Sequence, residues 1–173
     1  MGPHPFDPSI DWWNGFTFTA ANSGVVESID VAVSTYSGSS PAAMTFGLYT
    51  DVNGAVGSLL EEITVNALQL FGTGSVETGI AAGTTSMSAG TAYWLMAYSA
   101  ASTVWNSNNT GDVLNQAYST TGFGGTLAYY DNISEPDPFP SVGFRINAVP
   151  EPTTLVLMGL GLAGIGWKRR KAA

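Results

Sequence analysis

The residues with the clearest chemical pattern stand at the C-terminal end of this 173-residue chain. Pro150, Glu151 and Pro152 precede an uncharged apolar run over residues 153–167, and a cationic cluster follows that run. An apolar run that ends in cations is typical of a helix that enters a bilayer and stops there. The cations, which we expect to act as a stop-transfer signal, are Lys168, Arg169, Arg170 and Lys171. The residues expected to form the membrane anchor are Leu155, Leu157, Gly159, Gly161, Ala163, Gly164 and Trp167.

The expected membrane helix is short. Residues 153–167 would span about 22 Å as a helix, whereas a bilayer core is about 30 Å thick. Its flanks therefore have to contribute, with Trp167 at the interface and the cations in the headgroup region. The positive-inside rule then predicts that the cations are cytoplasmic and that the rest of the chain lies across the inner membrane. Gly159, Ala163 and Gly166 would share one helix face, which suits contact with a processing enzyme; the alternative is that glycine is simply frequent in membrane helices.

The order of these three parts resembles a PEP-CTERM sorting signal. Pro150, Glu151 and Pro152 match its signature triplet, and the apolar run and basic cluster match the rest. The resemblance implies recognition by an exosortase, a membrane cysteine protease-transpeptidase of Gram-negative bacteria. It also implies transient anchoring in the inner membrane with the body in the periplasm, cleavage near the triplet, and transfer to the cell surface or the exopolysaccharide matrix. Two prolines keep the triplet out of regular structure and therefore accessible.

The charge of the remaining chain is strongly one-sided. Arg145 is the only Lys or Arg before the basic cluster, and all acidic residues except Glu151 precede the triplet, so the body carries a formal charge of −11. Nucleic-acid binding needs Lys and Arg at phosphates, so we expect none. The chain has no cysteine, which excludes disulfides and thiolate chemistry.

The body has the pattern of an all-β protein. Over residues 28–36, Ile29, Val31 and Val33 alternate with smaller or polar residues, which predicts a half-buried strand. The segment 91–100 is apolar at successive positions and predicts a strand that is covered on both faces. Gly, Asn, Ser and Pro clusters separate the strands. We therefore expect a jelly-roll-like antiparallel β-sandwich over residues 1–148, followed by a single short C-terminal transmembrane helix within a sorting segment over residues 149–173.

A second, weaker resemblance covers about fifty residues of the body. It is similar to the choice-of-anchor β-sandwich domains of bacterial surface proteins, through Leu48, Tyr49, Asp51, Asn53, Gly54, Gly57, Leu59, Leu60, Tyr93, Trp94 and Leu95. This resemblance implies a jelly-roll-like sandwich and no particular reaction. From the residues themselves, Asn53-Gly54 predicts a tight turn because both residues tolerate positive φ. Leu59 and Leu60 are then expected to return the chain to the core.

Catalytic chemistry has little support in the sequence. The one histidine, His4, lies in a proline-rich N-terminal stretch, where a catalytic triad or metal centre is hard to build. Asp51, Asn53 and Glu62 have part of the spacing of a calcium loop, but Val56 replaces its glycine, so a hairpin turn is the favoured interpretation. A structural Ca²⁺ elsewhere in the sandwich is compatible with the sequence but has no assigned place. We expect no enzymatic activity and no cofactor.

The alternative function is carbohydrate binding. Exposed aromatic rings can stack on sugars, and Trp105 leads into an oxygen-rich loop. The residues predicted to face such a ligand are Trp105, Asn106, Asn108 and Asp112. A secreted hydrolase is a third interpretation. We expect Trp94, by contrast, to pack in the core.

The N-terminal ten residues, MGPHPFDPSI, lack the basic and apolar regions of a secretory signal peptide. Export of the body needs a targeting element, so we predict that the N-terminus is truncated or that its start codon is misassigned.

Overall fold

The computed structural model describes residues 12–35, 42–67, 69–70, 75–99, 103–106, 113–119, 126–134 and 141–150. In these ranges the chain forms strands and one short 3-10 helix, which confirms the all-β prediction. The elements are β1 (Trp12–Thr19), β2 (Gly24–Thr35), β3 (Ala42–Val52), β4 (Ala55–Ala67), β5 (Ser75–Ile80), β6 (Ser86–Met87), β7 (Ala92–Ser99), β8 (Thr103–Trp105), β9 (Gln116–Ser119), β10 (Ala128–Tyr130), η1 (Asn132–Ser134) and β11 (Phe144–Val149). The helix expected over residues 153–167 lies outside the described ranges, and within them no helix has the length and hydrophobicity to cross a membrane.

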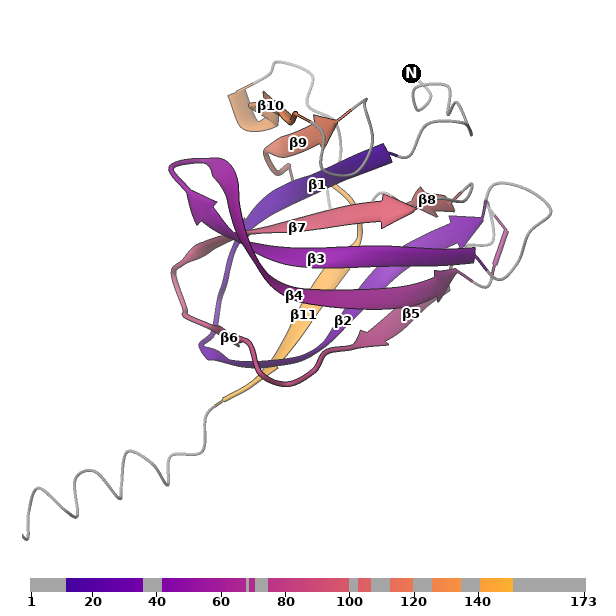
Figure 1. The fold of residues 1–173 in the computed structure, drawn as a ribbon, viewed down its shortest axis with the longest axis horizontal. Helices are drawn as coiled ribbons and strands as arrows, with labels where there is room; N and C mark the ends of the chain where they lie inside the picture. The colour runs from indigo at the N-terminus through magenta and orange to yellow at the C-terminus, as the bar shows by residue number, and fades with distance from the viewer. Residues whose placement is uncertain are drawn as a thin grey trace, which may run out of the picture.

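The strands form two antiparallel sheets that pack face to face (Figure 1). The larger sheet has the order β10-β9-β1-β7-β3-β4 and is called the front sheet below. In the other, the back sheet, β2 is central: Val33 pairs with both Ser75 and Trp105, and Val25 pairs with both Ser86 and Val149. β11 and β8 therefore follow one side of β2, while β5 and β6 follow the other. The chain crosses repeatedly between the sheets, as a sandwich requires.

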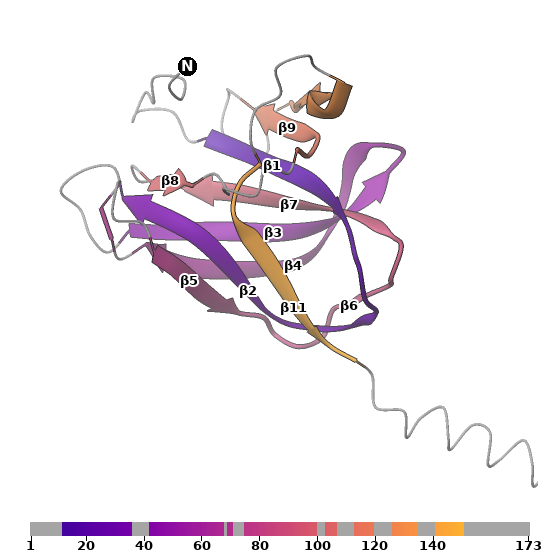
Figure 2. The same cartoon turned by 180° about the vertical axis from the view of Figure 1, so that it is seen from behind.

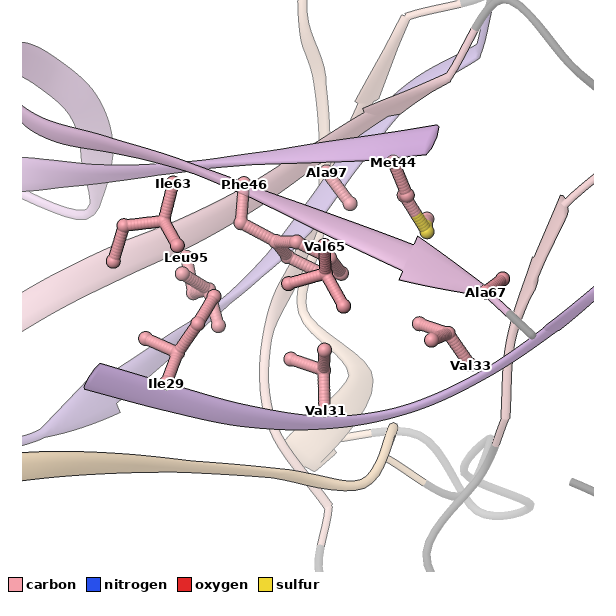
Figure 3. Close-up of a cluster of buried hydrophobic side chains, with 10 residues drawn as sticks. All are labelled: Ile29, Val31, Val33, Met44, Phe46, Ile63, Val65, Ala67, Leu95 and Ala97. Atoms are coloured by element: carbon pink, nitrogen blue, oxygen red, sulfur yellow. The ribbon is translucent and has the colours of Figure 1, made fainter. Parts of the chain in front are cut away.

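The main core lies between the two sheets (Figure 3). Ile29, Val31 and Val33 point from β2 toward the front sheet, and all three are at most 1% exposed. This confirms that the three side chains share one face, as predicted. The strand is not half-buried, however, because Asp30 and Ser34 on its other face are 8% and 0% exposed. The three apolar side chains of β2 meet side chains of β3, β4 and β7, namely Met44, Phe46, Ile63, Val65, Ala67, Leu95 and Ala97.

A second apolar cluster covers the outer face of the front sheet. Trp94 and Met96 of β7 are buried there with Tyr49 and Ala117, which confirms that β7 is covered on both faces and that Trp94 is a core residue. The Trp94 indole N–H donates to Asp51 Oδ1 at 2.7 Å, and the ring of Tyr129 meets it edge-on at 5.8 Å. The tip of the β3–β4 hairpin bends out of the sheet toward β10 to complete this cluster (Figure 1).

The hairpin tip is the predicted tight turn. Asn53 and Gly54 have φ of 55° and 82°, and the Gly54 N–H donates to Asp51 Oδ2 at 3.0 Å. Both oxygens of Asp51 are thus used within the protein, by the turn and by Trp94. This local arrangement agrees with the hairpin interpretation that we favoured over a calcium loop.

The prediction that Leu59 returns to the core is wrong. Leu48 pairs with Glu61 and Tyr49 with Leu59, so Leu60 is the extra residue of a β-bulge. The bulge changes the phase of the alternation, which leaves Leu59 48% exposed while Leu60 packs against a buried cluster. Glu61 shares the inward face of Ile63 and Val65, and its carboxylate accepts hydrogen bonds from Ala82 N and Thr85 Oγ1 at 2.7 Å each.

Candidate functional site

The last strand, β11, connects the sandwich to the C-terminal segment. Phe144 and Ile146 pack against the core, while the Arg145 and Asn147 side chains lie on the outer face. Pro150 follows the strand directly, is exposed, and has no regular secondary structure. The first residue of the triplet is therefore accessible, in agreement with the prediction for the whole triplet. Glu151, Pro152, the predicted anchor and the basic cluster lie outside the described ranges.

Asp30 of β2 connects its two neighbours in the back sheet, β11 and β5, through a polar network. Its Oδ2 accepts hydrogen bonds from Arg145 Nη2 at 2.6 Å, Arg145 Nε at 3.0 Å and Asn147 Nδ2 at 3.0 Å. Its Oδ1 accepts from Thr78 Oγ1 at 2.7 Å, and Asn147 also donates to Ser28 Oγ. One carboxylate on β2 thus joins β11 and β5. Arg145, the lone cation before the basic cluster, thus has a partner on β2 that local spacing does not indicate.

These hydrogen bonds, from Asn147, Thr78 and Arg145 in decreasing order of effect, lower the pKa of Asp30 from 3.8 to about 2. Because the pKa is lower in the folded protein, the ionised carboxylate stabilises the fold above about pH 4, and this stabilisation is lost as the pH falls toward 2. The Arg145 side chain is 74% exposed, so water screens the ion pair and we expect a contribution of about 1 kcal/mol.

Acid should therefore destabilise the wild-type chain more than Asp30→Asn, which cannot ionise. We expect the wild type to lose about 1 kcal/mol more unfolding free energy than this variant between about pH 5 and pH 2. Urea unfolding at a series of pH values measures the difference. Glu62→Gln, which changes an exposed carboxyl of β4, is the control and should follow the wild-type profile. Parallel profiles for wild type and Asp30→Asn would contradict this role of Asp30.

A groove runs along β11 and is lined mainly by β11 and the end of β1, with Glu27 of β2 and Met87 of β6 also in its lining. Its volume is about 430 Å³, and its lining includes the end of β1 and the turn that follows. Figure 2 shows how the strands β11 and β1 are placed. Phe18, Thr19 and Ala21 form one wall, and Ile146 and Ala148 belong to the other. The groove reaches Val149, the last residue before the triplet. No sequence signal indicated it, because its two walls are more than a hundred positions apart.

Of the four residues predicted to face a sugar, the structure describes Trp105 and Asn106, and both make contacts within the protein. Trp105 packs edge-on against Phe46 and Phe16, at ring distances of 5.0 and 5.7 Å, and its Nε1 donates to Gly143 O at 3.2 Å. Asn106 accepts a hydrogen bond from Ser34 Oγ at 3.1 Å. Asn108 and Asp112 lie outside the described ranges, as does His4. These contacts favour a packing role for Trp105, and ligand binding stays a prediction.

Comparison with known families identifies the C-terminal segment. The family model of the PEP-CTERM protein-sorting motif matches residues 148–171. No curated protein and no solved structure matches the chain. The chain thus carries a PEP-CTERM sorting motif, as the resemblance of its triplet, apolar run and cations predicts. The motif implies an exosortase-type processing partner and membrane-anchored transit followed by export. Its first two matched residues, Ala148 and Val149, belong to β11, so the predicted boundary after residue 148 falls within this strand.

Proposed function

We propose that this chain is a non-catalytic exported β-sandwich of a Gram-negative bacterium that is sorted through its C-terminal motif. The tail holds the body on the periplasmic face of the inner membrane until an exosortase-type transpeptidase cuts near Pro150–Pro152. The body then passes to the cell surface or the exopolysaccharide matrix. The observation that carries the proposal is the motif match over residues 148–171, which continues directly from an ordered strand.

Accessibility and charge support this order of events. Pro150 is exposed at the end of the sandwich, so an enzyme can approach the triplet while the body stays folded. The formal charge of −11 before the triplet and the four cations at the chain end suit opposite sides of a membrane, since cations are retained on the cytoplasmic side.

Three carboxylates of the body make structural hydrogen bonds, which supports a non-catalytic role. Asp30 joins three strands, Asp51 holds the hairpin turn and Trp94, and Glu61 binds the connection between β5 and β6. Acid–base catalysis needs such groups in reach of a substrate. Here these three acids are engaged in holding the fold.

C-terminal mass spectrometry tests the proposal. The full chain is produced behind a secretory signal peptide in two Gram-negative hosts, one with an exosortase-type enzyme and one without. In the first, we expect the exported protein to end near residues 150–152 and to have lost residues 153–173. In the second, the intact chain should remain in the membrane fraction. A variant with alanine at Pro150, Glu151 and Pro152 should stay uncleaved in both. An exported protein that retains Lys168–Lys171 in the first host would refute processing.

A further inference from the structure

The sorting motif has no spacer from the folded body. Its first matched residues, Ala148 and Val149, pair with Val26 and Val25 of β2. A side chain at Gly24 would collide with the Val149 carbonyl, so the end of β11 lies tightly against the start of β2. An enzyme that cleaves near the triplet must therefore work against the surface of the sandwich.

The backbone of β11 presents hydrogen-bonding groups away from β2. Ala32 N donates to Gly143 O, and in an antiparallel pair alternate residues face the partner strand. Arg145 and Asn147 therefore direct their N–H and C=O groups at β2, whereas Phe144 and Ile146 direct theirs outward. After the bulge that follows Asn147 the pattern holds for Ala148, because its partner Val26 donates toward Thr85 on the opposite side of β2. Among the described strands, β11 ends the back sheet.

The outward edge of β11 faces the groove. On the opposite side of the groove lies the end of β1. There β9 pairs with β1 only at Trp13–Phe16, so β9 does not cover Phe18 and Thr19. The pocket of about 430 Å³ fills this open side of the sandwich. An extended strand beside β11 would continue the back sheet and point alternate side chains at Phe18 and Ile146.

We propose that an extended segment of the exosortase-type enzyme binds in this groove and pairs with the outer edge of β11. This inference rests on the proposed function and adds the surface through which the enzyme holds its substrate. Pro150 and Pro152 have no N–H, so Glu151 is the only backbone donor of the triplet. An enzyme that recognises the substrate backbone by strand pairing close to the triplet must therefore use the residues before it. Phe144, Ile146 and Ala148 direct their backbone N–H and C=O groups outward at the spacing that a paired strand requires.

The surface around the groove exit is suited to this approach. The turns formed by residues 20–24 and 81–91 surround the end of β11 and contain no charged side chain. They are joined by hydrogen bonds, from Ala20 N to Thr91 O and from Ala89 N to Ser23 Oγ. The groove itself is lined by one acidic and one basic residue, Glu27 and Arg145. In a body with a formal charge of −11, an end with so little net charge limits repulsion from an enzyme embedded in an anionic membrane.

Two variants in which tryptophan replaces an alanine test the groove. Ala21 lines it, whereas Ala89 is exposed on the same end of the sandwich outside it. In the host with the enzyme, we expect Ala21→Trp to slow C-terminal cleavage roughly tenfold and to accumulate intact chain in the membrane, because the indole occupies the groove. Ala89→Trp should be cleaved at the wild-type rate. Circular dichroism of both variants should match the wild type.

Equal cleavage of wild type and Ala21→Trp would overturn the inference and leave the proposed function intact. Equal slowing of both variants would also overturn it, since the whole end rather than the groove would then be in contact. A wild-type dimer that Ala21→Trp dissociates would identify a second copy as the occupant, against our proposal. Failure of the wild type to be cleaved at all would instead refute the proposed function.

Hydrogen exchange gives a second measurement. The wild-type chain is compared with and without an enzyme whose catalytic cysteine is replaced. When this enzyme is bound, the amides of Phe144, Ile146 and Ala148 should exchange more slowly than in the chain alone. No change at these amides on complex formation would overturn strand pairing.

Discussion

Alanine at position 46 should lower the free energy of unfolding by about 3–5 kcal/mol, because the phenyl ring of Phe46 is fully buried between the two sheets. The ring contacts the core cluster of β2, β4 and β7 and meets Trp105 edge-on at 5.0 Å. Its removal leaves a cavity that the surrounding strands cannot close without moving. A domain of this size is stable by only about 5–15 kcal/mol, so the loss is a large fraction. Urea unfolding of the full chain in mild detergent, followed by circular dichroism, measures it.

Leu59→Ala is the control for this measurement. Leu59 stands on the neighbouring strand β4 but is 48% exposed, since the bulge at Leu60 turns it outward. We expect its replacement to change the unfolding free energy by less than about 0.5 kcal/mol. If Leu59→Ala destabilised the protein as much as Phe46→Ala, the assignment of the bulge would be wrong.

Leucine at both Gly159 and Ala163 should reduce processing roughly tenfold, which corresponds to about 1.4 kcal/mol less stabilisation of the cleavage step. In the helix expected over residues 153–167, these two positions lie on one face, where small side chains allow a close approach by a helix of the enzyme. Leucine favours membrane insertion, so anchoring should persist. The ratio of cleaved to intact chain, measured in membrane and exported fractions, gives the result.

Gly161→Leu is the matched control for the helix face. Two residues along a helix turn by roughly 200°, which places Gly161 opposite Gly159. The same change of residue should therefore leave processing near the wild-type rate. If Gly161→Leu blocked cleavage as strongly as the double variant, bulk anywhere on the helix would be the cause, and the interpretation of a docking face would fail.

Local pattern predicted much of the sandwich. The alternation of Ile29, Val31 and Val33, the apolar faces of β7 and the Asn53-Gly54 turn all depend on residues close in the chain, and the structure confirms each. These features follow from the two-residue period of a strand and from φ preferences, which neighbouring residues decide.

The errors and omissions have a common cause. Leu59 and Leu60 follow one another in the sequence, but a bulge against β3 decides which of them faces inward. The packing of Trp105 was an omission: its position before an oxygen-rich loop gave no sign that phenylalanines from β1, β3 and β11 contact its ring, and ligand binding there stays a prediction. In both cases the outcome depends on strands that are distant in the chain.

The sequence by itself determined the sorting motif, the charge separation between body and tail, and the all-β character, because each depends on composition or on short-range spacing. Only the tertiary structure decided that Asp30 meets Arg145, 115 positions away, and that β11 borders a groove beside the first residues of the motif. Register and neighbours in an antiparallel sheet are set by long-range packing, and alternation within one strand contains no information about which strand lies beside it.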